Sequence, residues 1–132
     1  MKSNKFIVIT SINQPTKAVY AFSKWPGWTT IVVGDRKSPA SWVCDNVIFL
    51  SVERQLFEYP EFADYLPFNS YVRKMIGYLH AFNNGASAIF ETDDDNIPYS
   101  NADLVLEADL LSNRLAGSVV SSESGWLNVY SE

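Results

Sequence analysis

Three consecutive aspartates, Asp93, Asp94 and Asp95, come soon after a short apolar run at 88–90. Carboxylates this close repel one another unless a cation lies between them. Mg²⁺ and Mn²⁺ prefer such oxygen ligands, and one or two carboxylates often hold them while substrate phosphates and water complete the shell. In an extended chain Asp93 and Asp95 project to one side and Asp94 to the other. The triplet therefore predicts a Mn²⁺ or Mg²⁺ site on Asp93 and Asp95, with a solvated acidic turn as the alternative.

Two further polar segments follow apolar, β-branched runs. The segment 10–14 supplies hydroxyls and amides, and Gly34 is followed by one acid and two bases, Asp35, Arg36 and Lys37. In open parallel sheets, ligands bind beyond the carboxyl ends of the strands. Together with the acidic triplet, these segments predict a site for a phosphorylated ligand and a divalent metal.

The elements that must position these residues alternate between strand and helix. This order predicts an α/β fold with a mostly parallel sheet. The segment 52–68 is aromatic, contains two prolines, and is expected to form an irregular, lid-like stretch with short helical pieces. Strands are expected over 5–10, 29–34, 46–51, 87–92 and 116–123, and helices over 15–25, 69–86 and 101–115.

The longest predicted helix, 69–86, begins at Asn69 or Ser70 as a cap and ends at Gly85. Arg73 and His80 lie seven residues apart and therefore share a face. They are either ordinary surface charges or one of them reaches the ribose or phosphates of the ligand, and His80 is expected to be a surface or packing residue. One apolar stripe is expected from Val72, Met75, Ile76, Leu79 and Phe82.

Size and composition narrow the function further. The chain has 132 residues, which predicts a single domain over 1–132, and its apolar fraction of 47% is enough for a core. A net charge of −5 argues against nucleic acid as a partner. Cys44 is the single cysteine, so no internal disulfide can form. No secretory signal and no run of roughly 20 apolar residues is present, and the expected location is cytoplasmic.

Other metal chemistries fit the sequence poorly. A helix–loop–helix calcium site needs an oxygen ligand where Ile97 stands and a glycine where Pro98 stands. Zinc is disfavoured because the chain has one cysteine and one histidine. An aspartyl-phosphate phosphatase places its acid pair after the first strand, whereas here the acids follow the fourth. Phosphate loops and dinucleotide-binding glycine motifs are absent from the sequence.

Several motifs occur in a familiar order: "VITSINQPTKAV", "WTTIVVGDRKSP", "SYVRKMIGYLHAFNNGA" and "IFETDDDNIPY". In this combination the chain resembles the STELLO-type family of glycosyltransferases, over residues 5 to about 130. The resemblance implies a Rossmann-like α/β/α sandwich, the nucleotide-binding part of an A-type glycosyltransferase fold. That fold carries its acceptor site after the D-x-D motif, so the resemblance also implies a domain cut short on the acceptor side.

The resemblance assigns roles to individual residues. The aspartates 93–95 match the D-x-D motif, with Asp95 on the metal, Asp93 at the ribose or sharing the metal, and Asp94 among the substrate-binding residues. Asp35 contacts the nucleoside, and Arg73 is the basic residue on the helix before the motif. Thr10, Ser11 and Ile12 match the first-strand loop that holds the base.

The implied function is transfer of a sugar from a nucleotide-diphosphate donor, with a uridine nucleotide expected, to an acceptor that the sequence does not identify. No general base is identified, and neither inversion nor retention is favoured. An inactive nucleotide-sugar-binding or scaffold module is the first alternative, and a metal-dependent phosphohydrolase is the second. Plant members of the family are Golgi membrane proteins, so the resemblance offers a lumenal domain as the alternative to a cytoplasmic location.

Overall fold

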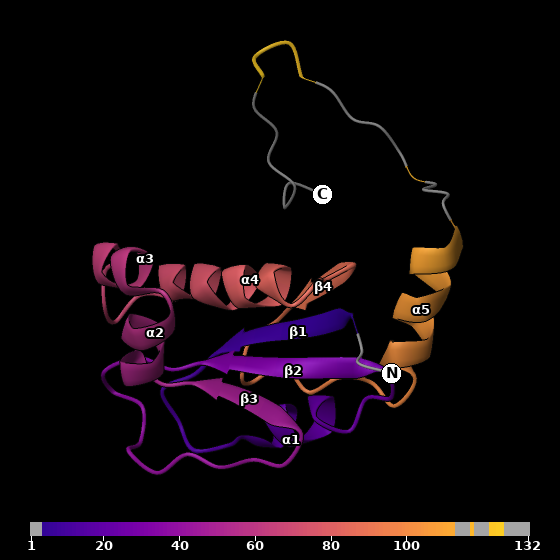
Figure 1. Cartoon of the computed structure of the whole chain (residues 1–132). Helices are drawn as coiled ribbons and strands as arrows, with labels where there is room; N and C mark the ends of the chain where they lie inside the picture. Colours follow the sequence, from indigo (N-terminus) through magenta and orange to yellow (C-terminus); the bar gives the residue numbers. More distant parts are fainter. Residues whose placement is uncertain (1–3, 113–116, 118–121, 126–132) are drawn as a thin grey trace.

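The sheet consists of four parallel strands in the order β3-β2-β1-β4 (Figure 1). The computed structural model describes residues 4–112, 117 and 122–125. The predicted α/β fold with a parallel sheet is confirmed, and each predicted strand from the first to the fourth is found within one residue of its expected position. The fifth predicted strand, 116–123, lies largely outside the described residues. The strands are β1 (Lys5–Thr10), β2 (Trp28–Val33), β3 (Val47–Leu50) and β4 (Ala88–Glu91).

In the described part of the chain, six helical segments flank this sheet. The segment predicted to be an irregular lid forms two short helices that meet at Pro60, which is consistent with that prediction. None of the described helices has both the length and the apolar character that a membrane crossing requires. The helices are α1 (Lys17–Phe22), α2 (Val52–Glu58), α3 (Pro60–Tyr65), the 3₁₀ turn η1 (Tyr71–Arg73), α4 (Lys74–Asn83) and α5 (Ala102–Ser112).

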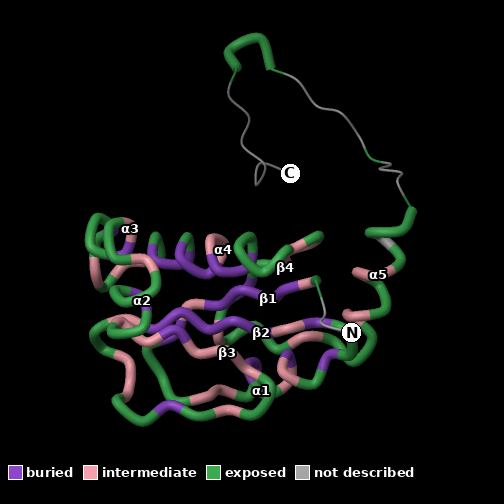
Figure 2. The backbone as a smooth tube through the Cα atoms, in the orientation of Figure 1, coloured by how far each residue is buried: buried purple, intermediate pink, exposed green. Residues whose placement is uncertain are grey.

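Two apolar cores lie on opposite faces of the sheet, which makes the fold a three-layer sandwich. Alternate residues of β1 belong to different cores: Phe6 and Val8 point to one face of the sheet, and Ile7 and Ile9 point to the other. Buried residues of α3 and α4 complete the first core. Residues of α1 and the three tryptophans Trp25, Trp28 and Trp42 complete the second, and α5 packs against this core through Ala102 and Leu106. Burial is accordingly concentrated in β1, β2 and the sheet-facing side of α4 (Figure 2).

Helix α4 buries a different face from the one its apolar stripe predicts. Ile76 is fully buried as expected, but Met75 is 45% and Phe82 67% exposed. The face on the sheet carries Gly77, where an added Cβ would lie 2.4 Å from Val8 Cγ1 and 2.8 Å from Val33 Cγ2. The close approach of the helix backbone to β1 and β2, which only glycine permits, sets which side of α4 is inside. The predicted stripe was therefore wrong for most of its members.

Local signals explain where these helices begin and end. The hydroxyls of Thr16, Ser51 and Ser70 each accept a hydrogen bond from a backbone N–H in the first turn of α1, α2 and η1. The cap predicted at Ser70 is confirmed. Gly85 follows α4 with a φ of +77°, the left-handed conformation in which glycine commonly ends a helix.

Candidate ligand-binding site

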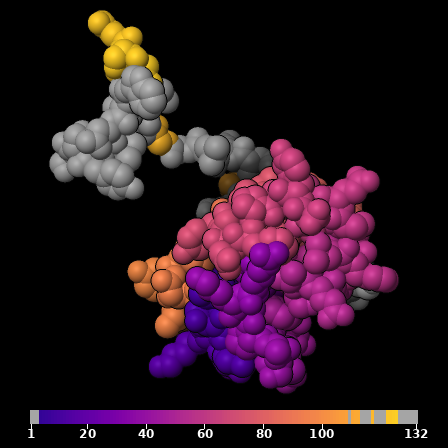
Figure 3. Space-filling view, turned by 90° about the vertical axis from the view of Figure 1, so that its left-hand side faces the viewer, coloured from indigo at the N-terminus to yellow at the C-terminus, as the bar shows by residue number. Residues whose placement is uncertain are grey.

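A cavity of about 340 Å³ opens where β1 and β2 end. This edge of the molecule faces the viewer in Figure 3, and the loops after β1, β2 and β4 come together there. Strand order reverses between β1 and β4, and ligands of doubly wound sheets bind at such a reversal. The volume lies within the range of small-molecule sites. The residues of the cavity wall come from three segments, 10–13, 33–37 and 69–73, with Asp94 added from the loop after β4.

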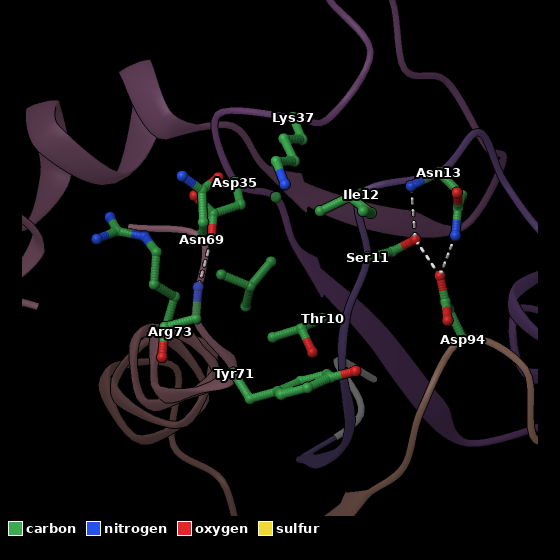
Figure 4. Close-up of a pocket in the computed structure, with 13 residues that line it drawn as sticks. Thr10, Ser11, Ile12, Asn13, Asp35, Lys37, Asn69, Tyr71, Arg73 and Asp94 are labelled. Carbon is green, nitrogen blue, oxygen red and sulfur yellow. Dashed lines mark hydrogen bonds between the residues drawn. The ribbon is translucent and has the colours of Figure 1, made fainter. Parts of the chain in front are cut away.

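Asp94 closes the gap between the loops that follow β1 and β4. Its carboxylate accepts hydrogen bonds from Ser11 Oγ at 2.5 Å and from Asn13 Nδ2 at 3.0 Å. Its backbone carbonyl accepts a further bond from the Thr16 hydroxyl at the start of α1. Figure 4 shows Ser11, Asn13 and Asp94 converging on one side of the cavity. The member of the triplet that contacts the cavity is therefore the central one.

Asp35 lies on the opposite side of the cavity and is held from two directions. Its carboxylate accepts hydrogen bonds from the backbone N–H of Arg36 at 2.7 Å and of Ser70 at 3.2 Å. Its own N–H donates to Ser38 Oγ, which in turn donates to the carbonyl of Ser11. The loops after β1 and β2 and the start of η1 are thus joined by one hydrogen-bonded chain, which fixes the carboxylate before any ligand arrives.

Arg73 also lines the cavity, but the protein itself occupies its guanidinium. The residue is 1% exposed. Nη1 donates to the carbonyls of Ala63 and Leu66, while Nε and Nη2 donate to Gln55 Oε1 at 3.1 and 2.7 Å. Among the described residues no carboxylate lies within ion-pairing distance of it. Burial lowers the pKa of Arg73, although Asp35 nearby opposes this.

Gln55 is the other half of this arrangement, and the sequence offers no motif that would single it out. Its Nε2 donates to the carbonyl of Gly34 at 2.8 Å and to that of Leu50 at 2.6 Å, which terminate β2 and β3. These bonds and those to Arg73 attach α2 and α3 to the floor of the cavity. Phe68 packs beside the same arginine, with the Arg73 guanidinium 4.1 Å and the Arg36 guanidinium 3.8 Å from its ring centroid.

Asp93 points away from the first cavity and toward α4. Lys74 Nζ donates to Asp93 Oδ1 at 3.1 Å, to Glu91 Oε1 at 2.7 Å and to the carbonyl of Thr92 at 3.2 Å. Burial alone would lower the pKa of Lys74, but the bonds to the two carboxylates outweigh it and the pKa is raised. The same ammonium lowers the pKa of Glu91. The positive charge of the buried Lys74 therefore offsets much of the repulsion between the neighbouring carboxylates.

The structure brings together most, but not all, of the residues proposed from the sequence. Asp93 lines a second cavity, described below, and Asp95 lines neither. Within the described part of the chain, no group of three acids, histidines or cysteines is arranged around a possible metal position. The cavity wall includes Thr10, Ser11, Ile12, Asp35, Arg73 and Asp94.

Several residues of the wall had no individual role assigned from the sequence, among them Asn13, Lys37, Asn69 and Tyr71. Asn13 and Lys37 stand in the polar strand-end segments that predict the site. Asn69 has a left-handed φ of 52° at the rim, and asparagine tolerates this conformation better than most residues. Tyr71 has no sequence signal beyond its closeness to Arg73. The buried Thr10 Oγ1 beside them makes no hydrogen bond within the described residues.

The sheet and its reversal define a Rossmann-like α/β domain, and the cavity is its candidate ligand site at the carboxyl edge. No protein-family model matches the chain. Over 93 residues, or 70% of its length, it is 36% identical to a protein of Arabidopsis thaliana named "Probable glycosyltransferase STELLO2" and 34% identical to one named "Probable glycosyltransferase STELLO1". The matched segment spans 12% of each relative. This similarity supports the STELLO-type family that the sequence motifs indicate.

Proposed function

We propose that this domain binds the nucleotide-sugar donor of a glycosyltransferase, with a uridine diphosphate sugar as the donor. The observation that carries the proposal is the cavity at the β1–β4 reversal, where loops after three strands meet in a chain whose relatives are named as glycosyltransferases. The fold alone would be compatible with many functions.

The wall of the cavity offers groups that suit a nucleoside. Ile12 is 48% exposed and gives an apolar surface for the flat face of a base. The Asp35 carboxylate retains acceptor capacity beyond the two backbone N–H groups that orient it, since an ionised carboxylate has about four lone-pair sites. The N–H of uracil and the hydroxyls of ribose are donors of the kind that such a carboxylate accepts.

The charge distribution of the cavity favours an anionic group. A buried guanidinium without an ion-pair partner among the described residues is electrostatically costly, and a diphosphate nearby would offset that cost. Arg73 would act through its field, because protein acceptors already engage each of its guanidinium nitrogens. Lys37, which is exposed and lines the same cavity, is free to move toward a phosphate. Lys37 and Arg73 would together supply the positive charge for which the family resemblance names Arg73.

Mn²⁺ or Mg²⁺ is part of the same proposal, with Asp93 and Asp95 as its protein ligands. The donor set fits, because both residues are exposed, both offer hard oxygens, and such ions often take only one or two carboxylates beside phosphates and water. When bound, the ion would stabilise negative charge on the leaving diphosphate. Asp93 would have to exchange part of its contact with Lys74 for the ion, whereas no hydrogen bond of the Asp95 side chain competes among the described residues.

Isothermal titration calorimetry with uridine diphosphate, with and without Mn²⁺, tests the proposal. The wild-type chain should bind the nucleotide, and Mn²⁺ should tighten binding. Asp95→Ala should abolish the Mn²⁺-dependent part, with Asp45→Ala at the far end of β3 as the matched control. Unchanged affinity in Asp95→Ala would remove the metal assignment, and no nucleotide binding to the wild type would remove the whole proposal.

Donor turnover separates the proposal from its alternatives. Slow Mn²⁺-dependent hydrolysis of the nucleotide sugar is expected of a transferase domain, because water can replace the acceptor. Saturable binding without hydrolysis or transfer would indicate a binding or scaffold module. Release of phosphate from simple phosphomonoesters would instead indicate a phosphohydrolase.

A further inference from the structure

A second cavity, of about 440 Å³, lies on the other side of Tyr71 from the first. Its walls come from η1 and the first half of α4 on one side and from the end of β4 and the following loop on the other. Tyr71 lines both cavities, and Figure 4 shows its ring crossing the first one next to Thr10. Any molecule in the second cavity would therefore be a neighbour of a molecule in the first.

The polar part of this cavity is a fixed arrangement of one cation and two anions. Lys74 has a side chain that is only 9% exposed, whereas the side chains of Glu91 and Asp93 are 54% and 51% exposed. The buried ammonium holds one oxygen of each carboxylate, at 2.7 and 3.1 Å. Both carboxylates are about half exposed and keep acceptor capacity beyond their bonds to the ammonium, so they can accept hydrogen bonds from a ligand. The group carries a net negative charge, which favours hydroxyl donors and disfavours anions.

The apolar part of the cavity is exposed. Tyr71 and Val72 of η1 and Met75 of α4 are 80%, 38% and 45% exposed. Tyr78 adds a second aromatic ring, and burial together with the nearby Glu91 raises the pKa of its hydroxyl. This hydroxyl is therefore a neutral donor and acceptor at physiological pH. Aromatic and thioether groups beside hydroxyl-accepting carboxylates match a ligand that has one apolar face and several hydroxyls.

We propose that this second cavity binds a neutral sugar ring, with its hydroxyls on Glu91 and Asp93 and its C–H face on Tyr71 and Met75. The proposal rests on the proposed function in one respect, because the ring is taken to be a sugar that takes part in the transfer reaction. It is either the acceptor or the sugar attached to the donor nucleotide, and the chemistry of the cavity is the same for both. Glu91, Asp93, Tyr71 and Met75 are the sugar-binding residues of this proposal.

Saturation-transfer NMR and calorimetry on the full chain test this proposal. The probes are methyl glycosides of glucose, galactose, mannose, xylose and N-acetylglucosamine, each measured with and without uridine diphosphate and Mn²⁺. A second set of titrations compares uridine diphosphate with uridine diphosphate glucose and galactose. The test variants are Glu91→Gln and Met75→Ala. Phe82→Ala is the matched control, because Phe82 is 67% exposed on the same helix and lines neither cavity.

Each source of the sugar has its own expected result. If the ring is the acceptor, at least one methyl glycoside binds, and Glu91→Gln weakens it about tenfold, as expected when a charged hydrogen-bond acceptor is lost. If the ring belongs to the donor, the same substitution weakens the nucleotide sugar about tenfold and leaves uridine diphosphate unchanged. Methyl glucuronide should bind more weakly than methyl glucoside in the first case.

The proposal is overturned if Glu91→Gln and Met75→Ala behave like Phe82→Ala toward both sets of ligands. It is overturned equally if no methyl glycoside binds at 50 mM, on the order of the weakest affinity such titrations detect, and nucleotide sugars bind no more tightly than uridine diphosphate. Failure of uridine diphosphate to bind the wild type is a separate result that concerns the first cavity. Thermal unfolding of each variant identifies any substitution that acts by destabilising the fold.

Discussion

The carboxylate of Asp94 lies 2.5 Å from the hydroxyl of Ser11, a residue 83 positions earlier in the chain. This contact joins the loops after the two strands between which the sheet order reverses. It places the acid in the wall of the first cavity and leaves its neighbours Asp93 and Asp95 outside that wall. Three adjacent aspartates therefore have three different surroundings.

Replacing Asp94 by asparagine should weaken nucleotide binding. An amide retains one acceptor oxygen but loses the negative charge that strengthens the bonds from Ser11 and Asn13. We expect affinity for uridine diphosphate to fall about tenfold, from a loss of roughly 1.4 kcal/mol. Calorimetry measures this, with Asp45→Asn as the control. An affinity equal to that of the control would mean that this contact does not shape the cavity.

The Arg73→Lys substitution should be strongly destabilising although it keeps the charge. A lysine cannot reproduce the planar fork that serves two carbonyls and Gln55. The acceptors left unpaired in a buried site should cost about 3 kcal/mol of unfolding free energy. Urea denaturation is the measurement. Arg54→Lys, on the exposed i,i+4 pair with Glu58, should change stability by less than about 0.5 kcal/mol.

Gly77→Ala tests the contact that selects the buried face of α4. The new methyl group would overlap Val8 and Val33, two packed side chains on neighbouring strands. Overpacking of this kind costs typically 1–3 kcal/mol, and we expect a loss near the upper end in chemical denaturation. Gly117→Ala is a suitable control, since a Cβ there meets no heavy atom within 4 Å. Wild-type stability in Gly77→Ala would show that α4 shifts freely on the sheet.

Stability should decrease as the pH falls below about 6.5, because burial lowers the pKa of His80 in the folded protein. Below this pH the unfolded chain binds a proton that the folded chain does not. The unfolding free energy therefore rises with pH, and the contribution of the neutral His80 is complete once the pH is above the pKa of the unfolded chain. The groups that face the imidazole are the Tyr59 hydroxyl at 2.7 Å, Glu58 at 3.4 Å and the neighbouring Arg54. The negative charge of Glu58 raises the pKa of His80, but burial has the larger effect and the pKa is lowered.

Urea titrations between pH 8 and pH 5 measure how the unfolding free energy changes with pH, over a range of about three units around the histidine pKa. His80 is the single histidine of the chain, so His80→Gln should flatten the profile. An unchanged slope in this variant would assign the effect to carboxyl groups. The prediction that His80 is a surface or packing residue agrees with its burial on the side of α4 that contacts Tyr59.

The sequence was sufficient for the sheet because the signals of its strands are local. Short apolar runs ended by Gly34 or by polar residues, and rich in β-branched residues in β1 and β2, define β1, β2 and β4 independently of one another. The same runs locate the carboxyl edge, and therefore the loops that carry Ser11, Asp35 and the acidic triplet. Most of the first cavity could be predicted in this way.

The orientation of α4 and of the triplet could not be predicted, because both depend on contacts between distant segments. The inner side of α4 is decided by Gly77 against two strands and by the polar anchors Arg73 and Lys74, none of which contributes to an apolar stripe. The extended chain expected at the triplet, with Asp93 and Asp95 on one side, is not found. The Asn96 N–H donates to the Asp93 carbonyl at 3.4 Å and closes a turn. Asp93 and Asp95 therefore have different surroundings, and Asp94 lies in the wall of the first cavity.

The side chain of Gln55 has a consequence for the rate at which the cavity can change shape. Two hydrogen bonds run from it to the ends of β2 and β3, and two more arrive from Arg73. An outward movement of α2 would have to break these four together, since one amide group makes all of them. Opening should therefore occur as a single rare event with one barrier, and amide hydrogens across α2 and α3 should exchange with solvent at a common rate.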